Sequence, residues 1–506
     1  MSDTIRDAEI LAVTPSAKRW WWVCAGVLVI AVAARLPLVR QGLWFDELTT
    51  YQNYVAKHFR TIVATDPYVP NNHVLHSLLA KGAMWIGREL RVIGPNVSEP
   101  GKFQFPAELV LRFPAMLAGA LAGVGLAWPL RRCLGQAAIV ALAASLHPWL
   151  INFSGEARGY TLTLLFCILG TNCLPLGSDE LTSTRGHLIG YALSMAAALY
   201  TVPIAGVMLV AHGVTMLALG WRQMLRWLAA AGAAGGVAIA LYSPMLKSMR
   251  AYYAEPCDPT ITYAQFLDLL PRVGLTGQAS PGPAWIYAAA LILVILVGGA
   301  LAWRRDLLRP ALVAFGVATL ISVLAPLRIP GAHEVRFVPW LIPLTAIAVA
   351  GILIALAERS MWLGATAGSA SALFALACLY GLSQTPAQPM REAARLLDGW
   401  VSGADTVADV NFGAYEALRA YSHLNLSHVH GWAHSGGEPG NPGTDWNGDP
   451  AVPPLQAKET WAMVPYEDLT RRDEPLMWEV LQRDYVLVRL LPGRLAPVAI
   501  YRRRGT

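Results

Sequence analysis

Long apolar stretches recur along most of this chain, and they constrain its fold more than any other feature. A helix that crosses a membrane needs about 20 mostly apolar residues, and residues 20–39, 108–130 and 361–383 each reach that length. Only 14% of the 506 residues are charged, whereas about 25% are charged in soluble domains. The sequence therefore predicts an α-helical, polytopic membrane protein.

The full set of apolar stretches predicts about 11 transmembrane helices. They are residues 20–39, 108–130, 135–151, 159–176, 187–201, 203–220, 227–246, 284–302, 310–327, 337–357 and 361–383. The fifth and sixth stretches are short, and only a few residues around Thr201 separate them. An error in that pair would reverse the orientation of every later helix.

Lysine and arginine residues gather in the connections on one side of these predicted helices. They are Lys18, Arg19, Arg131, Arg132, Arg185, Arg222, Arg226, Arg304, Arg305, Arg309 and Arg359. Short cytoplasmic loops carry an excess of basic residues, so we expect a cytoplasmic N-terminus and a C-terminal region on the outer side. Topology also explains the net charge of +6, and no nucleic acid is expected as a partner.

The pattern predicts three regions. Residues 1–19 form a cytoplasmic N-terminus, residues 20–383 a transmembrane domain, and residues 384–506 a small α/β domain on the outer face. Within the last region, residues 391–400 and 415–421 look helical, residues 406–410 and 485–490 look like strands, and residues 430–454 form a loop rich in glycine and proline. The first outer loop, residues 40–107, carries an apolar stretch whose spacing predicts helices lying in the membrane interface.

Charged residues fall at the outer borders of several predicted spans. They form four groups: Asp46 with Glu47, Glu108 with Arg112, Glu156 with Arg158, and Glu334 with Arg336. Charge at this depth costs free energy unless it is paired or serves a site, so the groups predict a functional site on the outer face. Solvated helix ends, local ion pairs and arginines that reach to the interface are the alternatives.

The residue types in these groups suit transfer of a sugar to a hydroxyl group. Such a reaction needs a carboxylate that accepts the hydroxyl proton and cations that stabilise the departing phosphate. Asp46 is the candidate general base. Arg158 and Arg336 are the candidate phosphate ligands, because a guanidinium binds phosphate oxygens with two parallel hydrogen bonds.

His73 and His76 are three residues apart and would share one face of a helix. Together with Asp46 or Glu47 they could bind a metal ion. Two ligands without a third are weak evidence, and hydrogen bonds to lipid headgroups or backbone are the favoured interpretation. The sequence indicates no required cofactor and leaves a divalent metal at these histidines as the alternative.

The order of these motifs resembles that of the GT-C membrane glycosyltransferases. The motifs are Leu43-Trp44-Phe45-Asp46-Glu47, Pro70-Asn71-Asn72-His73, Glu108-Leu109-Val110-Leu111-Arg112-Phe113-Pro114, Glu156-Ala157-Arg158-Gly159-Tyr160 and Glu334-Val335-Arg336-Phe337-Val338-Pro339. The most similar families would be the bacterial protein-mannosyltransferase-like and aminoarabinose-transferase-like enzymes, over about residues 20–383.

This resemblance implies a GT-C fold and an inverting enzyme in the bacterial inner membrane. The enzyme would move a single sugar from a polyprenyl-phosphate donor to a hydroxyl acceptor at the periplasmic face of the lipid bilayer. Asp46 would be the base or would orient the acceptor, with Glu47 supporting it as the second catalytic residue. The candidate substrate-binding residues are Asn72, His73, Glu156, Arg158, Glu334 and Arg336.

The acceptor could be a lipid, a glycan or a protein. The segment Asn71-Asn72-His73 departs from the Pro-Pro pattern of protein mannosyltransferases, which disfavours a protein. A transporter or flippase for a lipid-linked sugar is the main alternative function, although transporters commonly place ionisable groups near the midplane, and here they gather at one surface. A non-catalytic scaffold would leave the ordered acidic and arginine motifs unexplained.

Overall fold

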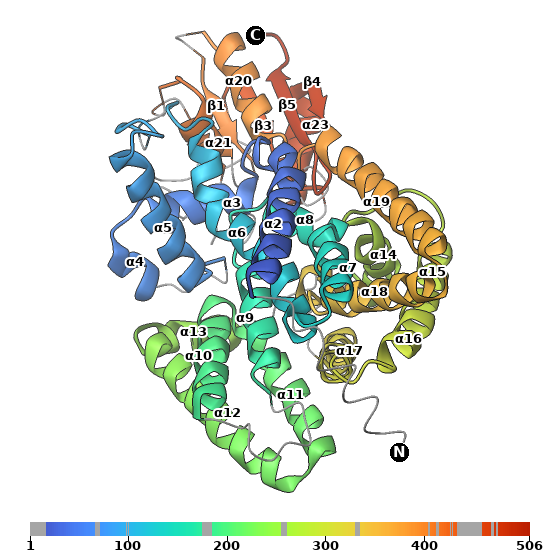
Figure 1. The fold of residues 1–506 in the computed structure, drawn as a ribbon. Helices are drawn as coiled ribbons and strands as arrows, with labels where there is room; N and C mark the ends of the chain where they lie inside the picture. The colour runs from blue at the N-terminus through green and yellow to red at the C-terminus, as the bar shows by residue number, and fades with distance from the viewer. Residues whose placement is uncertain are drawn as a thin grey trace, which may run out of the picture. The chain divides into compact units, whose positions relative to one another are not determined.

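The computed structural model in Figure 1 is mostly helical and ends in a small β-sheet. It describes all residues except 1–16, 66–70, 98, 100, 175–184, 255–260, 329–333, 403–404, 411–413, 426, 428, 433–457, 467–469 and 472–473. Most of the predicted N-terminal segment and of the predicted loop at 430–454 therefore lies outside the described residues. The predicted domain boundaries at residues 19 and 383 stay predictions.

The chain forms two compact units. The first unit comprises Met1–Leu36, Val63–His76 and Pro114–Tyr380, and the second comprises Pro37–Ile62, Ser77–Phe113 and Gly381–Thr506. The division falls inside five helices, which are α2 (Ala17–Val39), α4 (Phe59–Val63), α5 (Val74–Glu89), α6 (Ala107–Ala127) and α19 (Met361–Gln384).

The first unit is built from helices alone in its described part. After α6 they are η2 (Trp128–Leu130), α7 (Leu134–Ser145), α8 (Pro148–Ser154), α9 (Tyr160–Asn172), α10 (Arg185–Thr201), η3 (Pro203–Ala205), α11 (Gly206–Leu219), α12 (Trp221–Tyr242), η4 (Ser243–Met245), α13 (Leu246–Ala254), α14 (Tyr263–Thr276), α15 (Ala284–Leu293), η5 (Val294–Gly298), α16 (Gly299–Trp303), α17 (Arg309–Leu324), η6 (Ala325–Leu327), η8 (Val335–Phe337) and α18 (Leu341–Arg359). Each predicted span corresponds to one or more of these helices, α2, α6 and α19 included.

Seven helical segments of the described chain are long and apolar enough to cross a membrane. They are Lys18–Val39, Ala107–Leu130, Trp221–Ala254, Ala284–Trp303, Arg309–Leu327, Leu341–Arg359 and Met361–Gln384, and an eighth is the pair α7 and α8 if these two helices, bent by 60°, count as one span. The helices α9 and α11 are apolar but shorter. The polytopic helical fold is confirmed, and the predicted count of about 11 spans is not.

Small residues allow the helices of the first unit to pack closely. A Cβ atom at Gly298 would lie 2.1 Å from the backbone oxygen of Ala348, and one at Gly351 would lie 2.5 Å from the backbone oxygen of Gly298. Close backbone contact through small residues is how helices associate in lipid, where burial of apolar surface gives little driving force. The helix α18 is accordingly buried along most of its length.

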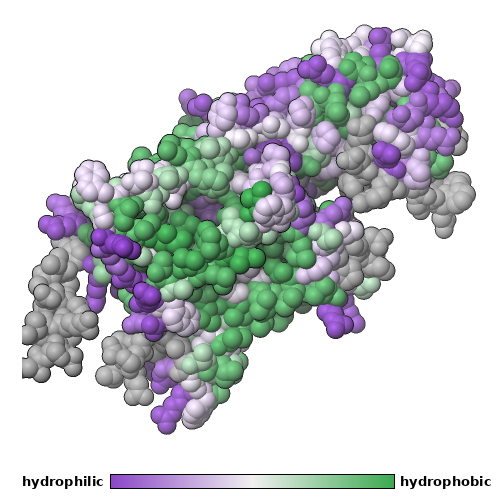
Figure 2. Space-filling view, turned by 90° about the vertical axis from the view of Figure 1, so that its right-hand side faces the viewer, coloured by the Kyte–Doolittle hydropathy of each residue, from purple (hydrophilic) through white to green (hydrophobic). Residues whose placement is uncertain are grey.

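Large apolar side chains remain exposed on the first unit. Figure 2 shows a broad hydrophobic surface on the face that carries α15 and α19. The exposed residues on these helices include Trp285, Ile286, Leu293, Trp362, Leu373, Phe374 and Leu376. A soluble protein rarely exposes such a large contiguous apolar area, so this surface suits contact with lipid.

The second unit combines short helices with a sheet. Its helices are α3 (Phe45–Thr50), η1 (Tyr51–Val55), most of α4 and of α5, α20 (Met390–Trp400), α21 (Ala414–Tyr421) and α23 (Pro475–Asp484). Its strands are β1 (Val407–Asp409), β2 (Val429–Gly431), β3 (Trp461–Val464), β4 (Tyr485–Leu491) and β5 (Val498–Arg503). The predicted helices at 391–400 and 415–421 and the predicted strands at 406–410 and 485–490 are confirmed.

The five strands form one mixed sheet in the order β2-β1-β3-β5-β4. The strands β2, β1 and β3 are parallel, with Val407 opposite both Val429 and Trp461, and β5 is antiparallel to β3 and β4. The helix α23 packs against this sheet through Met477, Val480 and Leu481. The small C-terminal α/β domain predicted from the sequence is therefore present.

Candidate active site

The helix α3 begins directly at the acidic pair. Glu47 stands in its first turn, and the Glu47 Oε2 atom accepts a hydrogen bond of 3.2 Å from the backbone N–H of Trp44, the residue before the helix. A glutamate in this position satisfies one of the backbone donors that a helix start leaves without partners. This contact therefore stabilises the start of α3, next to Asp46.

Glu47 forms a buried ion pair with Arg112 of α6. The Arg112 Nε atom lies 2.7 Å from Glu47 Oε1, and the Nη2 atom lies 2.5 Å from Oε2. Glu47 is fully buried, and Arg112 is 2% exposed. The same guanidinium donates to the backbone oxygens of Val39, Gln41 and Gly42 at 3.2, 2.6 and 3.1 Å, so it binds both the end of α2 and the start of α3.

A second buried contact holds the residues that lead into α3. Glu108 accepts hydrogen bonds of 2.8 Å from the Arg391 guanidinium and from the Tyr421 hydroxyl. The Tyr421 hydroxyl in turn accepts a bond of 2.8 Å from the backbone N–H of Leu43. Burial and the adjacent Glu108 raise the pKa of Tyr421 well above its usual value, so the phenol keeps the proton that it donates to Glu108.

Gln388 fixes the first residue of α3 itself. Its Oε1 atom accepts a hydrogen bond of 3.2 Å from the backbone N–H of Phe45, and its Nε2 atom donates to the Pro465 oxygen at 2.7 Å. The Phe45 ring packs edge-on against Tyr466, with ring centroids 5.9 Å apart. The backbone on the N-terminal side of Asp46 is therefore held at Leu43, Trp44 and Phe45.

Asp46 differs from its neighbour in exposure. It is partly exposed, whereas Glu47 is fully buried. A partly exposed carboxylate on a fixed backbone can receive a proton from a bound molecule, and a buried carboxylate in a bidentate ion pair cannot easily do so. The geometry accordingly suits Asp46 to chemistry and Glu47 to positioning of α3, while the predicted catalytic role of both residues remains a prediction.

The first unit contains a separate cluster of polar residues around His73. The His73 Nδ1 atom accepts a hydrogen bond of 2.7 Å from the backbone N–H of Gly159, so the ring proton lies on Nε2. A Cβ atom at Gly159 would lie 2.5 Å from Thr201 Cγ2 and 3.0 Å from His73 Cβ. Glycine is therefore required where the Glu156–Gly159 turn approaches the histidine.

Two arginines contribute to a low pKa of His73. Burial lowers the pKa of His73 well below its usual value, and the positive charges of Arg158 and Arg336 lower it further. Arg158 is 4% exposed and lies over the Tyr160 ring, 5.1 Å from its centroid. The structure thus brings His73, Arg158 and Arg336 together, and guanidinium groups are well suited to binding an anionic group.

Local contacts account for the remaining predicted binding residues. Arg336 donates to Glu334 at 2.8 Å, so these two residues form a local ion pair. The Asn72 amide donates to the Thr65 hydroxyl at 2.9 Å. Glu156 is 9% exposed, and its backbone oxygen accepts a bond of 2.8 Å from the Arg158 N–H.

His76 lies in the first turn of α5 and is fully buried. Neither of its ring nitrogens has a hydrogen-bond partner among the residues described. Burial, with a contribution from Arg158, lowers the pKa of His76 to about 3. No group of three or more metal-ligating side chains occurs in the described part of the chain, so the metal-site alternative gains no further ligand from the structure.

The predicted site residues thus fall into two groups. Asp46 and Glu47 belong to the second unit, whereas Asn72, His73, His76, Glu156, Arg158, Glu334 and Arg336 belong to the first. Their convergence on one face remains a prediction. Sequence reasoning paired Glu108 with Arg112, but the guanidinium of Arg112 hydrogen-bonds to Glu47, and Glu108 instead pairs with Arg391.

Arg391, Tyr421 and Gln388 were missed as contributors to the site. They lie more than 280 positions from their partners in the chain. Each belongs to the C-terminal region, whose composition gives no sign that it contacts the first outer loop. Sequence reasoning grouped Glu108 with Arg112, one helical turn apart, and found no sign of these distant partners.

Solved structures of similar fold are membrane proteins of the GT-C superfamily. The crystal structure of the aminoarabinose transferase ArnT from Cupriavidus metallidurans bound to undecaprenyl phosphate is 15% identical over 97% of this chain and 99% of that one, with a TM-score of 0.51. Its apo structure is 13% identical over 96% and 98% of the two chains, with a TM-score of 0.50. No protein-family model and no curated protein matches the sequence. The chain therefore has a GT-C fold, as the motif order implied.

Proposed function

We propose that this GT-C protein is a glycosyltransferase that moves a single sugar from a polyprenyl-phosphate donor to a hydroxyl acceptor, with inversion at the anomeric carbon. The ArnT structure with undecaprenyl phosphate covers nearly the whole chain, which supports a polyprenyl-linked donor for this fold. The observation that carries the proposal is the partly exposed Asp46 on a backbone that buried contacts hold in place.

In the proposed reaction, the Asp46 carboxylate takes the proton of the acceptor hydroxyl as its oxygen attacks the anomeric carbon. The bond between that carbon and the phosphate oxygen breaks, and the phosphate leaves with the bonding electron pair. A phosphate needs little protonation to leave, so one base suffices. Direct displacement from the opposite face inverts the configuration of the sugar.

The cluster around His73 is the proposed binding site for the donor phosphate. Arg158 and Arg336 supply positive charge, and a guanidinium forms charge-assisted hydrogen bonds to phosphate oxygens. Asn72, Glu156 and Glu334 would contact the donor sugar or keep these groups in place. A preformed set of donors stabilises the charge that grows on a leaving phosphate.

The reaction is proposed to occur at the periplasmic face of a bacterial inner membrane, with the N-terminus in the cytoplasm. The acceptor is proposed to be a lipid or glycan hydroxyl rather than a protein. A hexose or a pentose would serve equally in this chemistry. No cofactor is proposed, and transfer should continue in the presence of a chelator.

Purified protein in liposomes tests this function. A panel of radiolabelled polyprenyl-phosphate sugars is supplied with membrane lipid and glycan extracts, with and without EDTA. The proposal expects label to move from the polyprenyl carrier to a new product, and EDTA should leave the rate unchanged. Movement of intact donor across the bilayer without a new product would favour the flippase alternative and contradict the proposal.

A further inference from the structure

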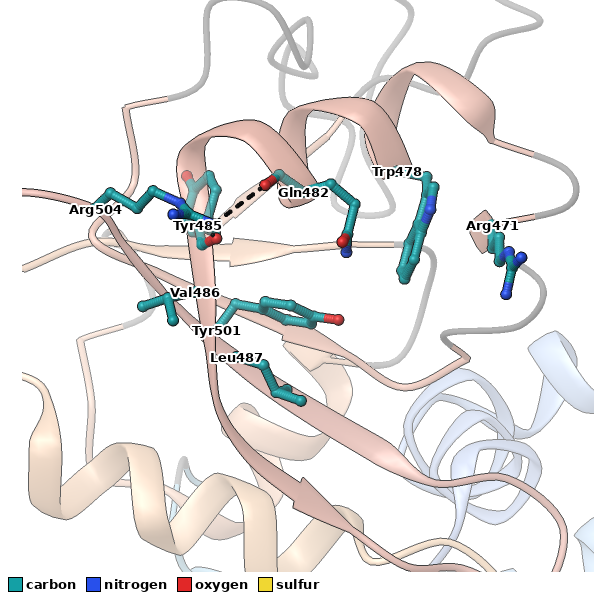
Figure 3. Close-up of a pocket in the computed structure, with 8 residues that line it drawn as sticks. All are labelled: Arg471, Trp478, Gln482, Tyr485, Val486, Leu487, Tyr501 and Arg504. Atoms are coloured by element: carbon teal, nitrogen blue, oxygen red, sulfur yellow. Dashed lines mark hydrogen bonds between the residues drawn. The ribbon is translucent and has the colours of Figure 1, made fainter.

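The C-terminal sheet domain contains a recess at the edge of its sheet, and its described lining residues include none of the candidate active-site residues. Its volume is about 470 Å³, within the range of about 300–1,000 Å³ that small-molecule sites occupy. The helix α23 forms one wall, and the strands β4 and β5 form another (Figure 3). All of its lining residues belong to the second unit.

The two walls present aromatic and apolar surfaces to the same space. In Figure 3, Trp478 projects from α23 on the side where the Tyr501 ring lies along the sheet, and Leu487 lies beside Tyr501. The Leu487 side chain is 45% exposed. The electron-rich face of an aromatic ring packs against the C–H groups of a sugar ring, which are the electropositive part of its surface.

The recess is rich in hydrogen-bond donors. The Arg471 guanidinium, the Gln482 amide and the Trp478 indole N–H have no hydrogen-bond partner among the described residues. The Arg504 guanidinium is held in place, because its Nε atom donates to the Tyr485 oxygen at 3.2 Å and its Nη2 atom to the Gln482 oxygen at 3.4 Å. Its other N–H groups are available to a ligand.

Carboxylates are absent from the described residues that line the recess. Asp484, at the end of α23, is bound by both the Nε and Nη2 atoms of Arg483 at 2.8 Å, so its charge is already compensated. A ligand for this recess should therefore supply hydrogen-bond acceptors and negative charge.

We propose that this recess binds an anionic saccharide, a sugar ring that carries a carboxylate or a phosphate group. The ring stacks between Trp478 and Tyr501, its hydroxyl groups bond to the Gln482 amide, and its anionic group pairs with both Arg471 and Arg504. The site is independent of Asp46 and of the sugar-transfer reaction proposed above. It gives the outer domain a binding function of its own.

Ligand-observed saturation-transfer NMR on the full chain in nanodiscs tests the site, with glucuronic acid and glucose 6-phosphate as probes. Both should bind, and Gln482→Ala and Arg471→Gln should each weaken binding at least tenfold. Both residues are exposed, so these substitutions should leave the fold intact. Trp400→Phe is the matched control, because Trp400 stacks on Trp461 elsewhere in the same domain and binding should be unchanged.

Two further probes separate a saccharide site from a simpler one. Glucose should bind at least tenfold more weakly than glucuronic acid, and inorganic phosphate should compete poorly because it lacks the ring. Equal binding of glucose and glucuronic acid would overturn the anionic part of the proposal. Phosphate that competes as well as glucose 6-phosphate would reduce the recess to a bare anion site, and unchanged binding by the Gln482→Ala and Arg471→Gln variants would overturn the location.

Discussion

Glu47 and Asp46 are adjacent acids with different environments, and the difference predicts different effects of substitution. Glu47→Gln keeps the shape of the side chain but leaves the Arg112 charge buried without its counter-ion. Removing one partner of a buried pair costs about 3–5 kcal/mol. We expect a clearly lower midpoint of thermal unfolding for this variant, measured in detergent by intrinsic fluorescence.

The control for this measurement is Glu358→Gln. Glu358 pairs with Arg305, but both side chains are substantially exposed, and exposed pairs contribute about 0–1 kcal/mol. Its unfolding midpoint should stay close to that of the unchanged protein. A Glu47→Gln variant as stable as Glu358→Gln would show that the buried pair does not hold α3.

His76 gives a prediction for acid stability. Its folded-state pKa is about 3, below the value of about 6.5 for an exposed histidine. At pH values between these two pKa values, His76 binds a proton in the unfolded chain but not in the folded chain. The free energy of unfolding is therefore highest above pH 6.5 and decreases as the pH falls. At pH 4.5, two pKa units below the exposed value, the loss from His76 is about 2–3 kcal/mol.

Replacing His76 by phenylalanine removes this titration. The unfolding midpoint of His76→Phe should fall less between pH 7 and pH 4.5 than that of the unchanged protein. His58→Gln, at an exposed histidine, is the matched control and should follow the unchanged protein. An acid sensitivity of His76→Phe equal to that of His58→Gln would contradict the burial of a neutral His76.

At the scale of elements, the position of α3 depends on the contact between α21 and the start of that helix. Tyr421→Phe removes the hydroxyl that links the Leu43 N–H to Glu108. The Leu43 N–H and the Glu108 carboxylate then each lose a hydrogen bond, and α3 should lose its fixed orientation. We expect kcat of the transfer reaction to fall about tenfold with little change in the KM for the donor, because a loss of about 1.4 kcal/mol of transition-state stabilisation gives this factor.

Tyr287→Phe is the control for this kinetic test. The Tyr287 hydroxyl donates a hydrogen bond of 2.7 Å to the backbone oxygen of Pro281 at an exposed position, so its removal should leave kcat unchanged. If Tyr421→Phe transfers sugar at the rate of Tyr287→Phe, the contact with α21 has no role in positioning Asp46.

The elements that the sequence failed to predict have a common physical cause. The strand β3 has four buried residues, Trp461–Val464, and so lacks the alternation that marks a half-exposed strand. Its neighbour β5 begins with buried residues and ends in two arginines. These strands form because of their neighbours in the sheet, and the local sequence gives no information about those neighbours.

At the scale of the molecule, the distribution of basic residues among the loops predicts how the protein is oriented in the membrane. Reporter fusions after Arg131 should place that loop in the cytoplasm, and fusions at the C-terminus should place it in the periplasm. Alkaline phosphatase is active only outside the cytoplasm and green fluorescent protein mainly inside, so the two reporters should give opposite signals. A cytoplasmic C-terminus would contradict the proposed location of the reaction.

The sequence predicts the fold better than it predicts the site. The lengths of the apolar stretches are enough to predict a helical membrane protein. The order of the short motifs is enough to predict the GT-C fold. The environment of each charged residue depends on distant partners: Arg112 bonds to Glu47 of the first loop, and Arg391 binds Glu108. Local spacing cannot show which carboxylate is buried and which, like Asp46, remains accessible.

The central claim is that Asp46 is the base of a sugar-transfer reaction. The most direct measurement is the rate of label transfer from a saturating radiolabelled polyprenyl-phosphate sugar by the unchanged protein, Asp46→Asn and Asp306→Asn, whose parent aspartate is 81% exposed in another loop. We predict that Asp306→Asn transfers normally and that Asp46→Asn loses about 10²–10⁴-fold in rate. Equal transfer by all three proteins would contradict the account.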